Sequence, residues 1–457
     1  IFNVLGSNTL TISSNLTDGT GGGGLTKNGT GTLTLNGTNT FTGAVVINAG
    51  TLATGSAGLL ADTANVTINS GGNYTVGAAD TINSIGGSGD LRLNAALTIG
   101  TSTFSGNISG ASAIATGGTL TFSGNNTNWT GGITVTNGAV FIAGADNAFG
   151  NGTLAGGNSF AATIRSSDAT DRTLANSISR ANGAGATLVL GSAGTGNLTF
   201  QGGFSSTNNL ALGTIQVDNA WTQFNGAVAS SGASYALTKT GNGTLILNGN
   251  NTYAGDTTIS AGTLQIGASG LLGGGNYTGN ITNNRAFVFA SNSNQTLGGV
   301  ISGSGALTKN GSSTLILTAL NTYSGGTTIN AGTLQLKAAA TNAYNTGNST
   351  FNINNGSTLL LSAGASGIPL LQGTVINIDS NGGATIVNDA LNALIQNSAG
   401  LTINTNGGAQ SQINLTNSGR WNNQGSGGGF IFNVASGTNA TADLLLSGSS
   451  AVTGQYA

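Results

Sequence analysis

One sequence pattern recurs along this chain, and its recurrence constrains the fold more than any other feature. The clearest copy, LTKTGNGTLILNGNNTYAGDTTISAGTLQIG, runs from Leu237 to Gly267, and a second clean copy runs from Leu307 to Leu336. An earlier copy occupies Leu25 to Gly55, and a degenerate fourth spans Gly118 to Gly144. Because internal repetition is typical of stacked structural units, the chain is expected to be a repeat protein.

Within each copy, apolar residues alternate with Thr, Ser or Gln, as in the Leu245/Leu247 and Leu264/Ile266 pairs. A period of two places alternate side chains on opposite faces, so each copy predicts short β-strands with one buried face. Between the strands, glycine follows Asn or Ala, and such pairs accept the positive φ of a corner at low steric cost. These pairs are Asn36-Gly37, Asn248-Gly249, Ala261-Gly262 and Ala331-Gly332.

A single copy offers too few inward Leu and Ile side chains to make a core of its own. Stacking coils of roughly 20–25 residues, about 4.8 Å apart, would bury them. The predicted fold class is therefore all-β, a parallel β-helix (β-solenoid) of roughly 20 coils with small insertions. One repeat position holds an aromatic residue in every copy: Phe41, Trp129, Tyr253 and Tyr323. We expect each ring to cover a corner of the core; stacking on carbohydrate is the alternative.

The composition excludes several classes of function. Only 5% of residues are charged, against roughly 25% in ordinary domains, and Glu, His, Met and Cys are absent. The 38% hydrophobic content at regular spacing argues against disorder. A net charge of −2 leaves no basic patch for nucleic acid. The lack of cysteine fits an extracellular protein and equally a cytosolic one, and the composition as a whole favours the outside.

Neither end of the sequence resembles the end of a complete protein. The chain begins without an initiator Met or a signal sequence, and the IFNV at Ile1 recurs at Ile431. We therefore expect a fragment of a longer repeat array, with no membrane insertion within this segment, since no apolar run approaches roughly 18 residues. Three segments are predicted: a repeat-containing solenoid over 1–337, a continued solenoid with irregular insertions and a short helix at 389–397 over 338–420, and the start of a further module over 421–457.

The repeated residues resemble the autotransporter-associated β-strand repeat of bacterial autotransporter passenger domains, L-T-K-x-G-x-G-T-L-x-L-x-G-x-N-T-Y-x-G-x-T-x-I-x-A-G-T-L-x-I. Leu237 to Ile266 matches this pattern at nearly every position, whereas the copy from Leu307 departs at Ser312-Ser313 and Ala319-Leu320. The four copies cover about a quarter of the chain. The resemblance implies secretion across the outer membrane, a right-handed β-helical rod, and a structural or adhesive role. It carries over no catalytic residue.

Charged residues concentrate at one place in the chain. Five of them fall in the short stretch that begins at Arg165 and ends at Arg180, and they are Arg165, Asp168, Asp171, Arg172 and Arg180. This set is the candidate binding cluster, for carbohydrate or another partner. The alternative is mutual salt-bridging on a solvated face.

An enzyme is the less favoured interpretation. Asp146 precedes Asp168 and Asp171 by close to the length of one coil, so these carboxylates are spaced to stack. A polysaccharide-acting β-helix enzyme needs two or three carboxylates with one raised pKa among them, and the remaining Asp residues show no clustering. Without His, Cys or Glu there is no zinc set and no His-dependent nucleophile. No catalytic residue, metal or cofactor is predicted.

The leading interpretation is a non-enzymatic extracellular protein, a β-helical rod that acts as an adhesin stalk or passenger at a bacterial surface. The first alternative is the subunit of an extracellular fibre or sheath that assembles end to end, since an open solenoid exposes strand edges. The second is the polysaccharide-acting enzyme. The partners considered are copies of the chain and host or environmental glycans, and nucleic acid is not expected.

Overall fold

The computed structural model contains β-strands and a single 3-10 turn, η1 (Gly273–Gly275), in the residues that it describes. Those residues are 1–338 except 56–58, 137, 158–160, 181–185, 207–211 and 231–235, and then 350–354, 356–363, 375–378, 384–388, 394–396, 401–405, 411–415, 420–422, 430–434 and 444–448. The chain forms two compact units, residues 1–231 and 232–457. Each unit is a stack of parallel coils, which confirms the predicted all-β parallel β-solenoid.

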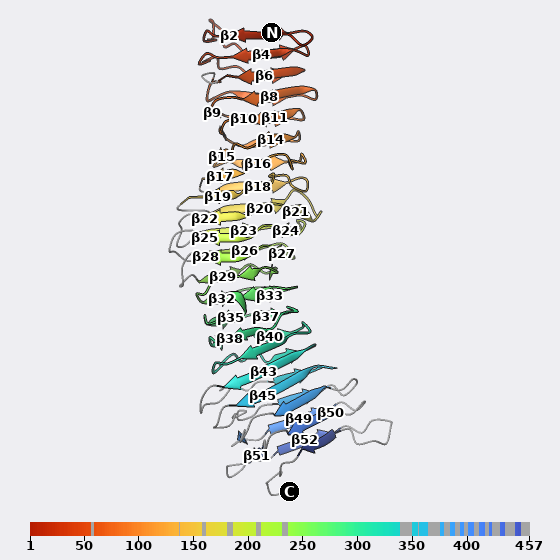
Figure 1. The fold of residues 1–457 in the computed structure, drawn as a ribbon. Coiled ribbons are helices and arrows are strands. Elements are labelled where there is room, and N and C mark those ends of the chain that lie inside the picture. Colours follow the sequence, from red (N-terminus) through yellow and green to blue (C-terminus); the bar gives the residue numbers. More distant parts are fainter. Residues whose placement is uncertain are drawn as a thin grey trace. The chain divides into compact units, whose positions relative to one another are not determined.

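In unit 1 the strands align, coil upon coil, into four sets (Figure 1). The first set is β1 (Phe2–Asn3), β3 (Leu25–Asn28), β5 (Val45–Ile47), β7 (Asn65–Ile68), β10 (Ser84–Gly87), β13 (Ser102–Phe104), β16 (Thr119–Phe122), β18 (Ala139–Ala143), β20 (Ala162–Ser166), β23 (Thr187–Leu190) and β26 (Gly213–Val217). The second is β2 (Thr9–Ile12), β4 (Thr32–Leu35), β6 (Gly50–Thr54), β8 (Gly72–Val76), β11 (Asp90–Leu93) and β14 (Ile108–Gly110). The third is β9 (Asp80–Ile82), β12 (Leu97–Ile99), β15 (Ile114–Thr116), β17 (Ile133–Val135), β19 (Leu154–Gly156), β22 (Ile178–Arg180), β25 (Phe204–Ser206) and β28 (Val228–Ser230). The fourth is β21 (Arg172–Leu174), β24 (Leu198–Phe200) and β27 (Trp221–Phe224).

Unit 2 likewise consists of sets of parallel strands. One set is β29 (Leu237–Thr240), β32 (Thr257–Ile259), β36 (Ile281–Asn283) and β39 (Ile301–Ser302). The longest is β30 (Thr244–Leu247), β33 (Thr263–Ile266), β37 (Ala286–Phe289), β40 (Ala306–Lys309), β42 (Thr327–Ile329), β44 (Thr350–Ile353), β46 (Val375–Ile378), β49 (Leu401–Thr405) and β52 (Phe430–Val434). A third is β35 (Asn276–Tyr277), β38 (Gln295–Leu297), β41 (Thr314–Leu317), β43 (Thr333–Ala338), β45 (Thr358–Ala363), β47 (Thr385–Asn388), β50 (Ser411–Leu415) and β53 (Leu444–Gly448). Two pairs complete it: β31 (Asn250–Asn251) with β34 (Leu271–Leu272), and β48 (Leu394–Gln396) with β51 (Arg420–Asn422).

Two expectations about regularity need correction. Coil length varies widely, because Gly86 pairs with Thr103 across a short coil whereas Ser411 pairs with Leu444 across one nearly twice as long. Since this range is wider than expected, the number of coils differs slightly from the predicted value. The predicted helix at 389–397 lies mostly outside the described residues, and the part that is described, β48, is a strand.

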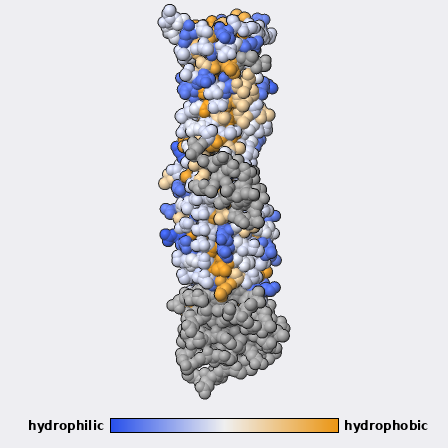
Figure 2. All heavy atoms as spheres, turned by 90° about the vertical axis from the view of Figure 1, so that its left-hand side faces the viewer, coloured by the Kyte–Doolittle hydropathy of each residue, from blue (hydrophilic) through white to orange (hydrophobic). Residues whose placement is uncertain are grey.

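The core follows the alternation of the sequence. In β30, Leu245 and Leu247 are fully buried while the residues that alternate with them are half-buried. Leu245 pairs with Leu264 in the next coil and Leu264 with Phe287 in the one after, so inward side chains form continuous columns. Each column removes apolar surface from water that a single coil would leave exposed. Where Figure 2 colours the surface by hydropathy, it is mostly hydrophilic or neutral, with scattered hydrophobic patches.

The corners depend on glycine in two different ways. At the Ala-Gly corner of the clean copy, Gly262 has a φ of +63°, as expected for a residue that turns the chain. Gly37, in an Asn-Gly corner, lacks a positive φ, so that part of the expectation is wrong. It is close approach that requires glycine there, because a Cβ would lie 2.5 Å from the carbonyl oxygen of Ser14 in the preceding coil.

Candidate functional site

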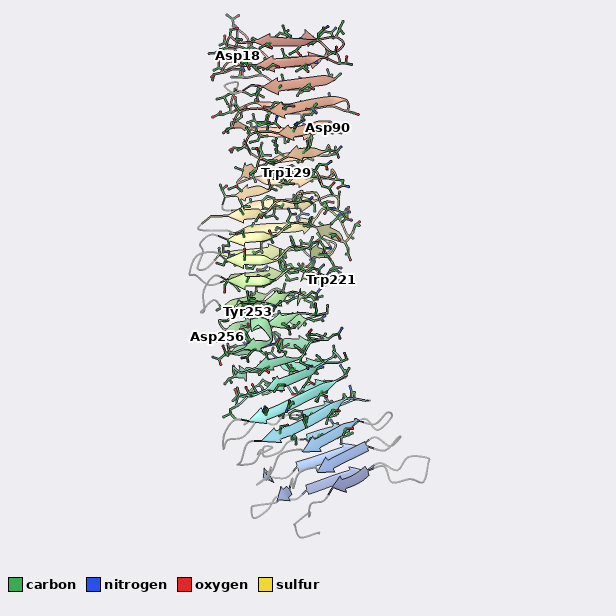
Figure 3. The ribbon with its side chains drawn as sticks, viewed as in Figure 1. Asp18, Asp90, Trp129, Trp221, Tyr253 and Asp256 are labelled. Atoms are coloured by element: carbon green, nitrogen blue, oxygen red, sulfur yellow. The ribbon has the colours of Figure 1, made fainter. Side chains whose placement is uncertain are left out.

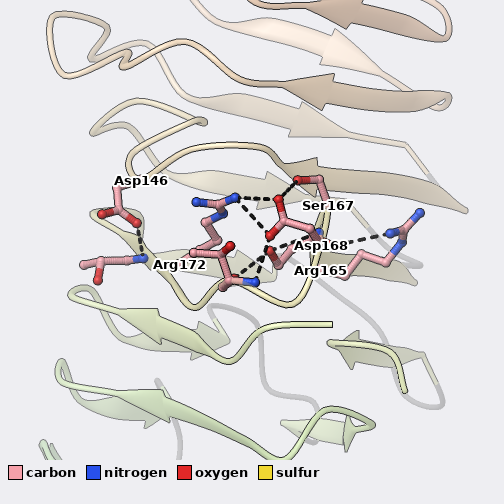
Figure 4. A network of polar contacts seen from close by, with 8 residues as sticks. Asp146, Arg165, Ser167, Asp168 and Arg172 are labelled. Carbon is pink, nitrogen blue, oxygen red and sulfur yellow. Dashed lines mark hydrogen bonds and ion pairs between the residues drawn. The ribbon is translucent and has the colours of Figure 1, made fainter. Parts of the chain in front are cut away.

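The five charged residues of the candidate binding cluster do not converge on one site, and Figure 4 shows the contacts of three of them, Arg165, Asp168 and Arg172. Asp168 and Arg172 form an ion pair, with 3.0 Å between Oδ2 and Nη2. Arg165 instead donates from Nη1 to the carbonyl oxygen of Ser166, at 3.3 Å. Asp171 accepts hydrogen bonds from the backbone and side-chain amides of Asn197 in the next coil. The structure therefore brings together two of the five, and the binding role stays a prediction.

The Asp168 carboxylate is the most strongly engaged member of the cluster. The backbone N–H of Thr170 donates to its Oδ1 at 2.8 Å, and Arg172 Nη2 lies 3.2 Å from the same oxygen. These contacts stabilise the charged form, so the bonds from Thr170, and after them the Arg172 charge, hold the pKa of Asp168 below its usual range. The aspartate side chain remains about half exposed, at 54%. Asp168 therefore holds together a surface loop through its contacts with Thr170 and Arg172.

Arg180 occupies an entirely different environment. Its side chain is fully buried, and it donates from Nη1 to Leu212 O at 2.9 Å and from Nη2 to Ala186 O at 3.1 Å. The guanidinium carbon lies 5.7 Å from the centre of the Phe204 ring. Burial lowers the pKa of Arg180, although a guanidinium remains charged. This arginine binds backbone carbonyls inside the solenoid and is not available to a surface ligand.

The proposed stacking of Asp146 with the later acids is not found. Asp146 Oδ1 accepts a hydrogen bond from the backbone N–H of Thr173 at 2.8 Å. This bond joins Asp146 to the backbone of the next coil, beside Arg172 (Figure 4). Asp171 Oδ1 accepts a hydrogen bond in the same way from the backbone N–H of Asn197, in the following coil, at 2.8 Å. Each acid joins one coil to the next, and no pair of carboxylates faces a common space among the residues shown.

Sequence reasoning missed a second set of charged residues, the lysines of the L-T-K motif. Lys27, Lys239 and Lys309 are all fully buried. Lys239 Nζ donates to Thr240 O at 2.6 Å and to Gly241 O at 2.9 Å within its own coil. Each lysine also reaches the carbonyl of the Ala in the Ala-Gly corner of the next coil; these residues are Ala49, Ala261 and Ala331, at 3.1, 3.2 and 3.1 Å. The ammonium group thus ties two coils together at a corner.

The signal for these lysines was present in the sequence. Alternation places the Leu of L-T-K inward and the Thr outward, so the Lys side chain must also point inward. Burial lowers the pKa of Lys27, and it lowers that of Lys309 to about 8. No anion offsets the charge of Lys27 or Lys309 in the described contacts; backbone carbonyls surround both, and the ring of Phe289 lies 5.7 Å from Lys309.

The same four stretches match a known repeat family. The Passenger-associated-transport-repeat profile matches residues 25–53, 117–140, 237–266 and 307–336. The chain carries four passenger-associated transport repeats. This confirms the resemblance to autotransporter passengers that the L-T-K pattern indicated.

A curated relative supports the same conclusion over a limited region. The chain is 34% identical over 200 residues to an adhesin autotransporter, BmaC, of Brucella suis biovar 1 (strain 1330). The alignment covers 35% of this chain and 6% of that protein, so the chain spans only a small part of the relative's length. No solved structure matches the chain significantly.

Each passenger-associated transport repeat buries the aromatic ring predicted to cover the core. Phe41, Trp129, Tyr253 and Tyr323 are at most 4% exposed, and Trp129 lies among the coils in Figure 3. Their polar atoms are paired inside: Tyr253 Oη lies 3.0 Å from Thr257 Oγ1, and Trp129 Nε1 donates to Ser112 O at 2.9 Å. The corner-covering interpretation is therefore confirmed, and these rings are not available for stacking on carbohydrate.

A buried Asn completes the corner of each passenger-associated transport repeat. Asn251 Nδ2 donates to Gly249 O at 2.8 Å and to Leu271 O in the next coil at 2.9 Å. Asn39 makes the equivalent bonds, to Gly37 O and Leu59 O, both at 2.8 Å. The amide thus satisfies backbone groups that leave the strand ladder at the turn.

The described parts of both units lack two further features. No group of three or more acidic side chains lies close enough together there to hold a metal ion. Nor do those residues include a helix with the length and apolar character needed to cross a membrane.

Proposed function

We propose that this chain is part of a surface-displayed, non-enzymatic adhesin passenger in which the solenoid serves as a stalk. The observation that carries the proposal is the recurrence of one corner device in all three L-T-K copies, made of a buried lysine, a buried asparagine and a buried aromatic ring. These residues are used in joining coils, as a spacer requires. The adhesin name of the Brucella relative supports the same role.

The chemistry of the acids supports a non-enzymatic role. A glycosidase-type general acid needs a carboxyl whose pKa is raised towards neutrality. The pKa of Asp168 is instead held low by the bonds from Thr170 and by Arg172. Asp146 and Asp171 each accept bonds from the backbone of the adjacent coil. These carboxylates are engaged in holding the fold together.

Surface display is tested in cells that express the full-length gene. An antibody against the solenoid should label intact cells, and protease added outside should remove the label. A second arm deletes residues 237–306, which removes one whole repeat period and joins Ala236 to Leu307, so that the L-T-K context is preserved. A stalk predicts that this shortened protein still reaches the surface and that cells still adhere.

Three results would count against the proposal. Absence of label on intact cells would refute surface display. Complete loss of adherence in a deletion variant that remains on the surface would show that the removed coils are the binding element and not a spacer. Release of reducing ends from a polysaccharide by the purified chain, lost in Asp168→Asn, would establish an enzyme.

A further inference from the structure

Trp221 breaks the rule that governs the other aromatic side chains. Among the described residues with defined burial, all aromatic side chains except Trp221 and Phe2 are buried. In β27, Thr222 and Phe224 face the core, so Trp221 and Gln223 face outward. Trp221 is labelled at the right-hand side of the coils in Figure 3. The Trp221 side chain is partly exposed, and Trp is enriched at binding surfaces because its ring is apolar and its N–H is polar.

The neighbours of Trp221 on this face are fixed by the register of three parallel strands. Asn197 precedes it by one coil, and its Oδ1 accepts the Trp221 backbone N–H at 2.9 Å. Asp171 precedes Asn197 by one coil, joined at 2.8 and 3.0 Å. The next outward column is Thr173, Thr199 and Gln223. Coils are about 4.8 Å apart and alternate residues about 7 Å apart, so the six side chains form a flat grid.

The grid offers one aromatic platform beside hydroxyl, amide and carboxylate groups. An indole face is complementary to the apolar face of a sugar ring, and hydroxyl and amide groups in rows match the hydroxyls at its edge. The grid itself holds one negative charge, at Asp171, and no cation. Arg172, the nearest in sequence, is at an inward register position and is paired with Asp168. An acidic polymer would therefore be repelled at short range.

We infer that this face, Asp171, Thr173, Asn197, Thr199, Trp221 and Gln223, is a binding site for an extended neutral glycan. The ring of Trp221 stacks on one sugar, and the rows of amides and hydroxyls contact the sugars that follow across the coils. The site contains one member of the predicted charged cluster, Asp171, and excludes Arg180. It rests on the proposed function in that it supplies a ligand class for a surface adhesin.

The test is calorimetric titration of the purified full chain with cellohexaose and with chitohexaose, two neutral β-linked hexasaccharides. We expect binding of at least one, with a change in tryptophan emission. Trp221→Ala should weaken it roughly tenfold or more, and Trp221→Phe should retain most of it because a ring remains. The matched control is Gln216→Ala, an outward residue of β26 in the same coil but on another face. Circular dichroism and thermal unfolding establish that each variant is folded.

Three outcomes would overturn the inference. The first is that neither hexasaccharide binds to the wild-type chain. The second is that folded Trp221→Ala binds as tightly as wild type, and the third is that only an acidic polymer, polygalacturonate, binds. Failure here is distinct from failure of the adhesin proposal, because surface labelling and adherence would be unaffected by a Trp221 variant if the glycan site were wrong.

Discussion

Replacing Lys309 with Met tests whether burial lowers the pKa of this repeat lysine, so that its amine is neutral in the folded chain at high pH. The lysine side chain is fully buried, and its Nζ donates to the carbonyl oxygens of Gly311 and Ala331. Burial without an anion disfavours the ammonium and lowers the pKa of Lys309 to about 8. Methionine has a similar length but cannot take up a proton, so the variant removes the titration while keeping most of the packing.

The sign of the effect follows from proton linkage. In the unfolded chain, Lys309 titrates near its ordinary pKa of 10.5. Between pH 8 and that value the unfolded chain binds one more proton than the folded chain, so folded stability rises with pH across this window. Each pH unit contributes about 1.4 kcal/mol. The free energy of unfolding of the wild type relative to Lys309→Met should therefore increase by about 2–3 kcal/mol from pH 8 to pH 10.

Guanidinium unfolding of both proteins at several pH values, followed by circular dichroism, measures this difference. Lys337→Met is the matched control, since Lys337 is an exposed lysine in β43 of the same unit. It should keep the wild-type pH dependence. The series stops near pH 10 because Tyr253 and Tyr323, whose pKa values burial raises, titrate in the unfolded chain around their ordinary pKa of 10.0 and lower folded stability as the pH rises further. An equal difference at pH 8 and pH 10 would refute the reasoning.

Three further predictions concern the coil contacts. Leu245→Ala should lower the free energy of unfolding by about 2–5 kcal/mol in denaturant titrations, whereas Thr244→Ala on the same strand should change it by less than about 1 kcal/mol; equal effects would contradict the inward column. Gly37→Ala should cost about 1–3 kcal/mol because its new Cβ would meet the Ser14 carbonyl, while Gly19→Ala, which meets nothing within 4 Å, should be tolerated. Asp168→Asn should lower the thermal midpoint only slightly, since its ion pair is at the surface; a large drop would show that its contacts contribute more to stability than a surface ion pair does.

The sequence predicted the fold because the physical signals that specify it are local. Leu245 and Leu247 alternate with half-buried residues in the structure, as a period of two requires. Coil length was less predictable, because strands of one coil pair in parallel with those of the next whether few or many residues separate them along the chain. The short coil that ends at Thr103 and the long one that ends at Leu444 both keep parallel strand pairing, so the pairing carries no record of their difference in length.

The candidate site was less accessible to sequence reasoning, because closeness along the chain does not fix the direction of a side chain. Arg165 in β20 and Arg180 in β22 lie close together in the sequence, yet Arg180 is at an inward position of its strand and is fully buried. Alternation applied through the whole of L-T-K would have placed Lys27 inside, but a charge is ordinarily assumed to face water. The same rule applied to Trp221 would have placed its ring outside. In both cases the register is more informative than the type of residue.

The internal use of cations also changes what the surface can recognise. Four of the ten cationic side chains, Lys27, Lys239, Lys309 and Arg180, are fully buried, and Arg172 is paired with Asp168. Few cations remain to attract a charged partner over long distances, and salt would screen those that do. At the inferred glycan site, recognition would then depend on short-range contacts, namely hydrogen bonds from Asn, Gln and Thr and stacking on the partly exposed Trp221 ring. The burial of four cations thus favours a neutral ligand over an anionic one at the glycan site that we infer.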